Sequence, residues 1–257
     1  MLFRSRDGGQ AHVYSCDITD AESVDATVKA MLADHSGPDT GIDMLVNNAG
    51  RSIRRSVKLE LDRFHDFERT MAINYFGAIR LTMALLPHMI ERRFGHVVDI
   101  SSIGVQTGPP RFSAYVASKA ALDAWARIVA TEVIGDGVTF TTVHMPLVRT
   151  DMIAPTKIYD AFPTLSPEEA ADMVVNALIH RPKHVGTALG TLGAVSASLT
   201  PRIVDVVMHV AYRVFPESRA AREGSDELTP GEDRALQAGP LSRGAQAFAR
   251  LHPGVHW

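Results

Sequence analysis

The chain has 257 residues, of which 46% are hydrophobic and 21% charged, with a formal net charge of −3. This composition is typical of one globular domain, with or without an appendage, and excludes a mainly disordered chain. The slight acidic excess disfavours a nucleic-acid-binding protein, because such proteins usually carry a basic excess. The chain has one cysteine, Cys16, and begins without the apolar core of a signal peptide, so we expect a cytoplasmic protein.

Short apolar runs alternate with helical patterns along the first two-thirds of the chain. The runs predict strands at 11–16, 43–46, 96–100 and 138–144. The patterns between them predict helices at 20–33, about 64–92 and 115–133. Strands that alternate with helices favour a doubly wound parallel α/β sheet with both faces covered.

The last third of the chain has a different character. Ser166 as N-cap, Pro167 at the first helical position and Glu169 two residues later predict a helix start. A second helix is predicted from Pro201, with an apolar stripe that favours a core or oligomer surface over a membrane anchor. The stripe consists of Ile203, Val206, Val207, Val210 and Val214.

The chain becomes polar from about residue 216, which indicates a loosely ordered tail. We therefore divide it into 1–200, a partial dinucleotide-binding domain, and 201–257, an amphipathic helix and tail. No transmembrane segment is expected, because the longest run without charged residues in the C-terminal half, 184–201, is rich in glycine, serine and threonine.

Tyr115 and Lys119 are the sharpest chemical feature of the sequence. Four residues apart on a helix, they lie on one face, and a cation beside a phenol stabilises the phenolate and lowers the phenol pKa. Such a pair is suited to donating and accepting a proton near neutral pH. Taken alone, the pattern favours an ordinary surface pair.

Further polar residues follow or interrupt the apolar elements. Ser102 ends the strand HVVDISS, at the edge where open α/β sheets bind ligands. The sequence 47–50 (NNAG) follows another buried strand. Asn74 lies inside a helical pattern that otherwise favours apolar residues, and a buried asparagine costs stability unless it is hydrogen-bonded.

Together these motifs resemble the short-chain dehydrogenase/reductase family over about residues 11–150. The resemblance implies a Rossmann-like fold, a nicotinamide cofactor (NADP, with NAD not excluded) and a homo-oligomer. It also implies that Tyr115 protonates the carbonyl oxygen while Ser102 holds that oxygen. Lys119 would bind the nicotinamide ribose and lower the tyrosine pKa, and Asn74 would hold a water in the proton relay.

The family resemblance also implies cofactor contacts. Asp17 would contact the adenine, although it could equally belong to the N-terminal region of a helix. The loop 47–50 would line the adenosine side or support the sheet, and the residues after the strand 138–144 would contact the carboxamide. The predicted cofactor-binding residues are Asp17, Ile18, Asn47, Ala49, Gly50, Tyr115, Lys119, Val148 and Thr150.

Two departures from the family pattern stand out. Met145 and Pro146 occupy the places of a usual Pro-Gly pair, so we expect a different loop path there. The glycine-rich turn that binds the pyrophosphate does not precede Ala11, and the glycines of 186–193 have the wrong spacing. We therefore expect the first β-α-β portion to be missing, through a misassigned start, a longer parent protein or a true truncation.

Three segments resemble the bacterial fatty acyl-CoA reductase branch of the family: 146–173, 181–190 and 212–218. This branch reduces acyl thioesters to fatty aldehydes, by hydride addition that gives a hemithioacetal and then releases the thiol. The expected substrate is a fatty acyl-CoA or a long-chain aldehyde or ketone, with 152–162 and the stripe from Ile203 covering the acyl chain. The alternative is a catalytically incompetent fragment or a non-catalytic partner subunit without the phosphate loop.

Three arginines, Arg51, Arg54 and Arg55, follow the loop 47–50 closely. They could contact phosphates of CoA or of a carrier protein, or form a solvated basic patch, and of the two we favour the patch. The eleven histidines have no metal-ligand spacing, so no metal site is expected.

Overall fold

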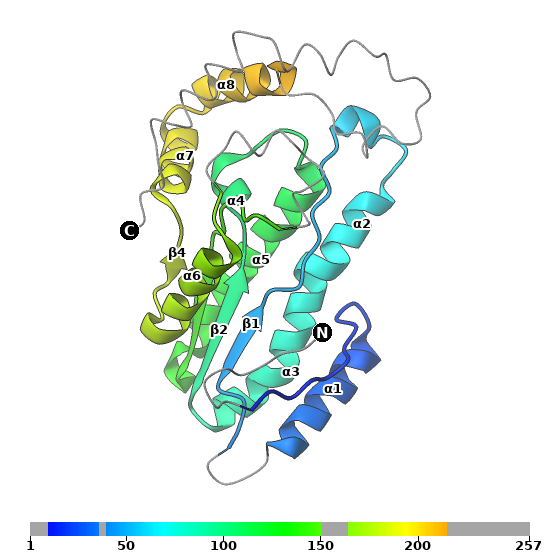
Figure 1. Cartoon of the computed structure of the whole chain (residues 1–257), viewed down its shortest axis with the longest axis vertical. Coiled ribbons are helices and arrows are strands. Elements are labelled where there is room, and N and C mark those ends of the chain that lie inside the picture. Colours follow the sequence, from blue (N-terminus) through cyan, green and yellow to red (C-terminus); the bar gives the residue numbers. More distant parts are fainter. Residues whose placement is uncertain (1–9, 36–39, 151–163, 215–257) are drawn as a thin grey trace.

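The computed structural model describes residues 10–35, 40–150 and 164–214. These residues form a parallel four-stranded sheet in the order β1-β2-β3-β4 (Figure 1). The strands are β1 (Met44–Asn47), β2 (Gly95–Ile100), β3 (Val138–Val143) and β4 (His184–Val185). The main helices are α1 (Ala21–Asp34), α2 (His65–Met71), α3 (Ala78–Glu91), α5 (Ser113–Val133) and α6 (Pro167–His180). The predicted parallel α/β fold is confirmed.

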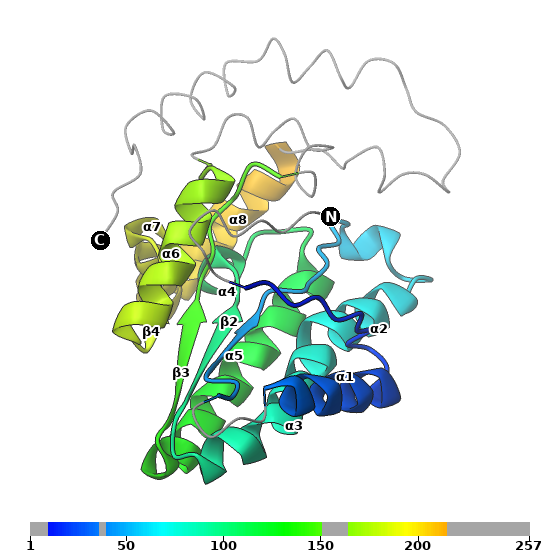
Figure 2. The ribbon, with the colours of Figure 1, turned by 60° about the horizontal axis from the view of Figure 1, so that its bottom comes forward.

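The side chains of the strands alternate between two faces, and helices cover both (Figure 2). On one face, Leu45, Val97 and Phe140 pack with α1, α3 and α5 in the larger hydrophobic core. On the other face, Val98 and Val143 pack against α6. Odd-numbered residues of β1 and β2 therefore face α3 and α5.

The segment 11–16 is not a strand, and this prediction was wrong. It runs without a sheet partner next to α1, and Val13 in its middle is 76% exposed. Its polar contacts are local, such as the Thr27 hydroxyl, which donates to the Ser15 carbonyl over 3.2 Å. An apolar alternation predicts a strand only if another strand pairs with it, and pairing is a property of the whole sheet.

The start of α6 has the predicted capping box. The Ser166 hydroxyl accepts from the Glu169 amide over 3.1 Å, and the Glu169 carboxylate accepts from the Ser166 amide over 2.7 Å. Two backbone donors that the helix itself leaves without a partner are thereby satisfied. The cap stabilises the start of α6. Further along the helix, the completely buried Ala177 packs on the β2–β3 face of the sheet.

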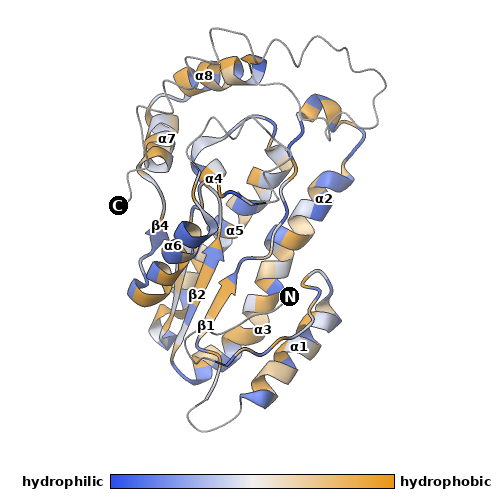
Figure 3. Ribbon diagram, in the orientation of Figure 1, coloured by the Kyte–Doolittle hydropathy of each residue, from blue (hydrophilic) through white to orange (hydrophobic). Residues whose placement is uncertain are grey.

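Two helices, α7 (Ala188–Leu199) and α8 (Pro201–Val214), follow the sheet. The amphipathic α8 is confirmed, whereas α7 was not predicted. The stripe on α8 is exposed within the described residues, since Ile203, Val206, Val207 and Val210 are 52–64% exposed. Hydrophobic colour concentrates on the strands and on one side of α8 (Figure 3).

None of the helices in the described ranges is long and apolar enough to span a bilayer. The predicted tail after residue 216 and the predicted cover at 152–162 lie outside the described residues. The division at residue 200 stays a prediction, although α8 begins at Pro201.

Candidate active site

The candidate site lies where β1 and β2 end and α5 begins. Ser102 directly follows β2 and caps the short helix α4 (Ile103–Thr107), because its hydroxyl accepts from the Gly104 amide over 3.0 Å. Tyr115 lies in the first turn of α5 and hydrogen-bonds to the Ser102 side chain. The strand end and the helix start therefore bring the two hydroxyls together.

The phenol of Tyr115 does not have the lowered pKa expected from a neighbouring lysine. Burial raises its pKa above the usual value, the hydrogen bond to Ser102 offsets part of this rise, and the charge of Asp123 adds to it. The ammonium group of Lys119 donates instead to the Ile100 carbonyl over 2.6 Å. The phenol of Tyr115 is therefore protonated at neutral pH.

Lys119 is buried one helical turn after Tyr115. Burial lowers its pKa to about 8, while the negative charges of Asp99 and Asp123 work in the opposite direction. Asp99 faces α5 because it is an odd-numbered residue of β2. A buried ammonium is costly unless carboxylates compensate it, so Asp99 and Asp123 keep Lys119 charged at neutral pH.

Asn74 is fully buried in the π-helical turn η2 (Ala72–Gly77), which joins α2 to α3. Its amide oxygen accepts from the Arg51 amide over 2.7 Å, and its amide nitrogen donates to the Arg51 carbonyl over 2.8 Å. The same nitrogen donates to the Ser118 hydroxyl over 2.9 Å. Such π-helical turns often occur at functional sites. Asn74 therefore fixes the loop after β1 to α5.

The loop 47–50 approaches this cluster closely at Gly50. A Cβ atom on Gly50 would lie 3.1 Å from the Asn74 amide oxygen and 3.4 Å from the Lys119 ammonium. Asn47 is buried, and its side chain donates to Thr82 and Asp99 over 2.9 and 2.8 Å. Its side chain therefore supports the sheet, while Ala49 is exposed.

Asp17 and Ile18 directly precede α1 in the sequence, and Ile18 lies next to the π-helical turn η2. The Asp17 carboxylate accepts from the amide and hydroxyl of Thr19 over 2.9 and 2.7 Å, which lowers its pKa. The cap of α1 is Asp20 rather than Asp17. Ile18 packs on Gly77, where a Cβ would lie 2.8 Å from the Ile18 side chain. Both residues thus lie near the turn that carries Asn74, and their cofactor role stays a prediction.

Val148 and Thr150 lie in the segment after β3, apart from the residues above. Val148 forms an isolated parallel bridge with Leu165. The Thr150 hydroxyl donates to the Val148 carbonyl over 3.4 Å and is exposed. Their predicted contact with a cofactor stays a prediction.

Three polar residues near Lys119 were not predicted. Asp99 is buried, and burial raises its pKa to about 6 although the Asn47 hydrogen bond and Lys119 oppose the rise. The Asp123 carboxylate accepts a hydrogen bond from His144 Nε2 over 2.9 Å. Extending the spacing of Tyr115 and Lys119 by four residues would have revealed Asp123. Asp99 could have been noticed in the sequence as the single acidic residue of the apolar run 96–100.

Within the described ranges, no three histidine, cysteine or acidic side chains come together in a way that could hold a metal ion.

Comparisons with known proteins agree with this geometry. The family model "short chain dehydrogenase" matches residues 3–158. A Fatty acyl-CoA reductase of Acinetobacter baylyi is 50% identical over 252 residues, which cover 97% of this chain and 79% of the relative. The crystal structure of a short-chain dehydrogenase from Streptomyces avermitilis matches with a TM-score of 0.63 and 28% identity, over 78% of this chain and 80% of that one.

A short-chain dehydrogenase from Burkholderia cenocepacia, solved in complex with NADP, has the same fold, with a TM-score of 0.63 and 23% identity over 75% of this chain and 76% of that one. The family model covers more than half of the chain, and the relative from Acinetobacter matches nearly all of it. The expected resemblance to the family and to its fatty acyl-CoA reductase branch is confirmed: the chain belongs to the short-chain dehydrogenase family, whose members are oxidoreductases.

Proposed function

We propose that the protein reduces a fatty acyl-CoA to an aldehyde with NADPH, and that Tyr115 is the proton donor. The observation that carries this proposal is the hydrogen bond between Tyr115 and Ser102, with Lys119 one turn away on α5. The similarity to the Fatty acyl-CoA reductase of Acinetobacter baylyi supports the choice of substrate. A long-chain aldehyde or ketone is the alternative substrate within the same chemistry.

The residues present fit the ribose and adenine parts of a nicotinamide cofactor, whereas the glycine-rich turn for its pyrophosphate does not precede Ala11. The missing side chain of Gly50 leaves space next to Asn74 and the Lys119 ammonium. Lys119 would hold ribose hydroxyls, because an ammonium group offers three donors, and Asp17 and Ile18 would flank the adenine. When bound, the reduced nicotinamide supplies the hydride. NADPH is the proposed form, and NADH is to be compared in the same assay.

Tyr115 and Ser102 divide the work on the carbonyl oxygen. The Ser102 hydroxyl donates a hydrogen bond to this oxygen and orients it, while Tyr115 transfers its phenolic proton as negative charge develops there. The raised pKa of Tyr115 suits reduction, since the phenol is protonated before the reaction. Lys119 and a water held by Asn74 then return a proton from solvent to the Tyr115 phenolate. With a thioester substrate, the tetrahedral product releases the thiol and leaves the aldehyde.

The test is an assay of the purified full chain with NADPH and a long-chain acyl-CoA. We expect NADPH consumption matched by aldehyde formation. Replacing Tyr115→Phe removes the proton but keeps the ring, so kcat should fall about 10²–10⁴-fold. Tyr14→Phe is the matched control, because Tyr14 hydrogen-bonds to the exposed Asp34 beside α1.

Two results would contradict the proposal. A Tyr115→Phe variant with full activity would remove Tyr115 from the mechanism. A wild-type chain that consumes no NADPH with acyl-CoA, aldehydes or ketones would instead support the non-catalytic alternative, above all if calorimetry detects no NADPH binding.

A further inference from the structure

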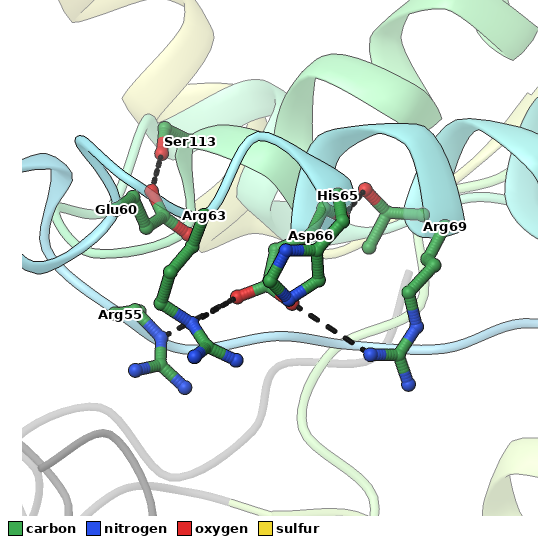
Figure 4. A network of polar contacts seen from close by, with 8 residues as sticks. Arg55, Glu60, Arg63, His65, Asp66, Arg69 and Ser113 are labelled. Atoms are coloured by element: carbon green, nitrogen blue, oxygen red, sulfur yellow. Dashed lines mark hydrogen bonds and ion pairs between the residues drawn. The ribbon is translucent and has the colours of Figure 1, made fainter. Parts of the chain in front are cut away.

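Three arginines surround one buried carboxylate at the start of α2. The Asp66 side chain is only 4% exposed and lies 3.5 Å from the Arg55 Nε, 3.2 Å from the Arg63 Nε and 3.9 Å from an Arg69 terminal nitrogen. His65 Nε2 lies 3.3 Å from the same carboxylate. Figure 4 shows Arg55 and Arg63 approaching Asp66 from one side and Arg69 from the other. We call Arg55, Arg63, Asp66 and Arg69 the arginine cluster.

The network of polar contacts around the arginine cluster holds three arginines and two buried carboxylates, Glu60 and Asp66 (Figure 4). Of the arginines, Arg63 and Arg69 remain 33% and 49% exposed. The segment 51–69 has six Arg and Lys against four Asp and Glu, although the whole chain has a net charge of −3. Two of these four acids, Glu60 and Asp66, are buried. The exposed side of the cluster is therefore suited to an anion.

Arg63 has hydrogen-bond donors that its contact with Asp66 does not use. Its contact with Asp66 is made through Nε, at 3.2 Å. A guanidinium has five N–H donors, and its two terminal nitrogens match a phosphate group in a bidentate manner. Asp66 thus positions the Arg63 guanidinium through Nε, and the contact does not use its two terminal nitrogens.

The arginine cluster lies beside the start of α5, where Tyr115 is located. The Thr70 hydroxyl of α2 lies 3.4 Å from the Ala114 carbonyl, and α2 packs along α5. The Arg55 amide donates to the Arg111 carbonyl over 2.8 Å, and the Ser113 hydroxyl donates to Glu60 over 2.9 Å. Both contacts join the cluster's segment to residues that directly precede Tyr115.

We propose that the arginine cluster binds the phosphate groups of the coenzyme A part of the substrate, a proposal that rests on the acyl-CoA reduction proposed above. Coenzyme A has a 3′-phosphate and a diphosphate at one end and the reacting thioester at the other. The pantetheine arm between them would run from the cluster to Tyr115. NADPH also has phosphate groups, so the experiment must separate the two sources.

The test is calorimetric titration of the full chain with free CoA, with 3′-dephospho-CoA and with NADPH. For the Arg63→Gln/Arg69→Gln double variant we expect the Kd for CoA to rise about tenfold or more, as for the loss of charge-assisted hydrogen bonds. The Kd for NADPH should stay unchanged. Wild-type protein should bind 3′-dephospho-CoA more weakly than CoA, and the double variant should lose this difference.

Arg92→Gln is the matched control, because Arg92 is also partly exposed and pairs with one carboxylate, Asp43, at 2.6 Å. It should leave CoA binding unchanged. Arg69→Glu alone, at an exposed position, provides a second variant if the double variant folds poorly, and should weaken CoA binding further than Arg69→Gln.

Equal CoA affinity in wild type and variants would overturn the proposal. Parallel loss of NADPH binding would assign the cluster to the cofactor instead. Because binding is measured without turnover, CoA binding in a chain that reduces no acyl-CoA would refute the proposed function and leave this inference standing.

Discussion

The charge of Lys119 depends on two carboxylates, the buried Asp99 and the half-buried Asp123. Burial lowers the pKa of Lys119 to about 8, and both carboxylates oppose this change. The pKa of Asp99 is itself raised to about 6, so Asp99 is ionised at neutral pH. Lys119 and Asp99 are therefore both charged only between about pH 6 and pH 8.

We predict that this window appears in the pH profile of reduction. As pH rises through about 8, Lys119 loses its charge, so kcat/KM should fall. Asp99→Asn removes a negative charge that raises the Lys119 pKa, so the falling limb should move to lower pH. The amide oxygen of the new residue can still accept from Asn47. The measurement is kcat/KM against pH.

Asp43→Asn is the control for this pH shift, because Asp43 is partly exposed and pairs with Arg92. An unchanged falling limb in Asp99→Asn would show that Asp99 does not act on Lys119.

Individual site residues differ in how well their surroundings could be predicted. Tyr115, Lys119 and Ser102 follow from local spacing and from the end of a strand, and the structure brings Tyr115 and Ser102 into contact. The raised pKa of Tyr115 could not be predicted, because burial depends on the packing of the whole domain. Likewise, Arg55 stood out in the sequence, but the carboxylate that it meets, Asp66, lies eleven residues later on another element.

Among the elements, α6 is stabilised by interactions within its own first turn. Its capping box satisfies backbone donors locally, and Ala177 then anchors the helix on the sheet. Because α6 covers the face of the sheet that contains Val98 and Val143, its stability contributes to that of the fold.

We predict that Ser166→Ala lowers the free energy of unfolding by about 1 kcal/mol, the usual cost of losing an N-cap side chain. Urea unfolding followed by circular dichroism measures this change. Ser198→Ala, in the exposed part of α7, should change the free energy by less than about 0.5 kcal/mol. Equal effects of the two substitutions would contradict a capping role for Ser166.

Elements with local signals were predicted well, and elements that depend on distant contacts were not. The apolar runs at 96–100 and 138–144 became β2 and β3 within one residue at their ends. The run at 11–16 did not become a strand, because nothing in its own sequence specifies a neighbour. The π-helical turn was not predicted either, since Asn74 is held there by Arg51, 23 residues earlier.

At the scale of the whole molecule, α8 is the last described helix, and it contacts the residues that precede α5 and the candidate site. The Arg111 guanidinium donates to the Tyr212 carbonyl over 2.9 Å and lies 4.2 Å from the centre of the Tyr212 ring. Arg111 itself lies just before α5, with a positive φ of 73°. The far end of α8 is thus fastened close to Tyr115, although its apolar stripe is exposed.

We predict that Arg111→Ala loosens α8 from the rest of the protein. The variant loses the hydrogen bond and the cation–π contact with Tyr212, so amides of 201–214 should exchange hydrogen faster while β2 and β3 stay protected. Hydrogen exchange followed by mass spectrometry measures both regions. Arg202→Ala, on the exposed side of α8, is the control, and equal protection in Arg111→Ala and wild type would refute the anchor.

The row Tyr115, Lys119 and Asp123 has a consequence for engineering. All three lie on α5, a 21-residue helix whose later turns are buried through Ala126 and Ala130. Their spacing is therefore set by backbone hydrogen bonds, at about 6 Å of rise for every four residues, and not by adaptable side-chain packing. The row can therefore be moved only as a rigid unit, and altering the distances within it would require bending α5.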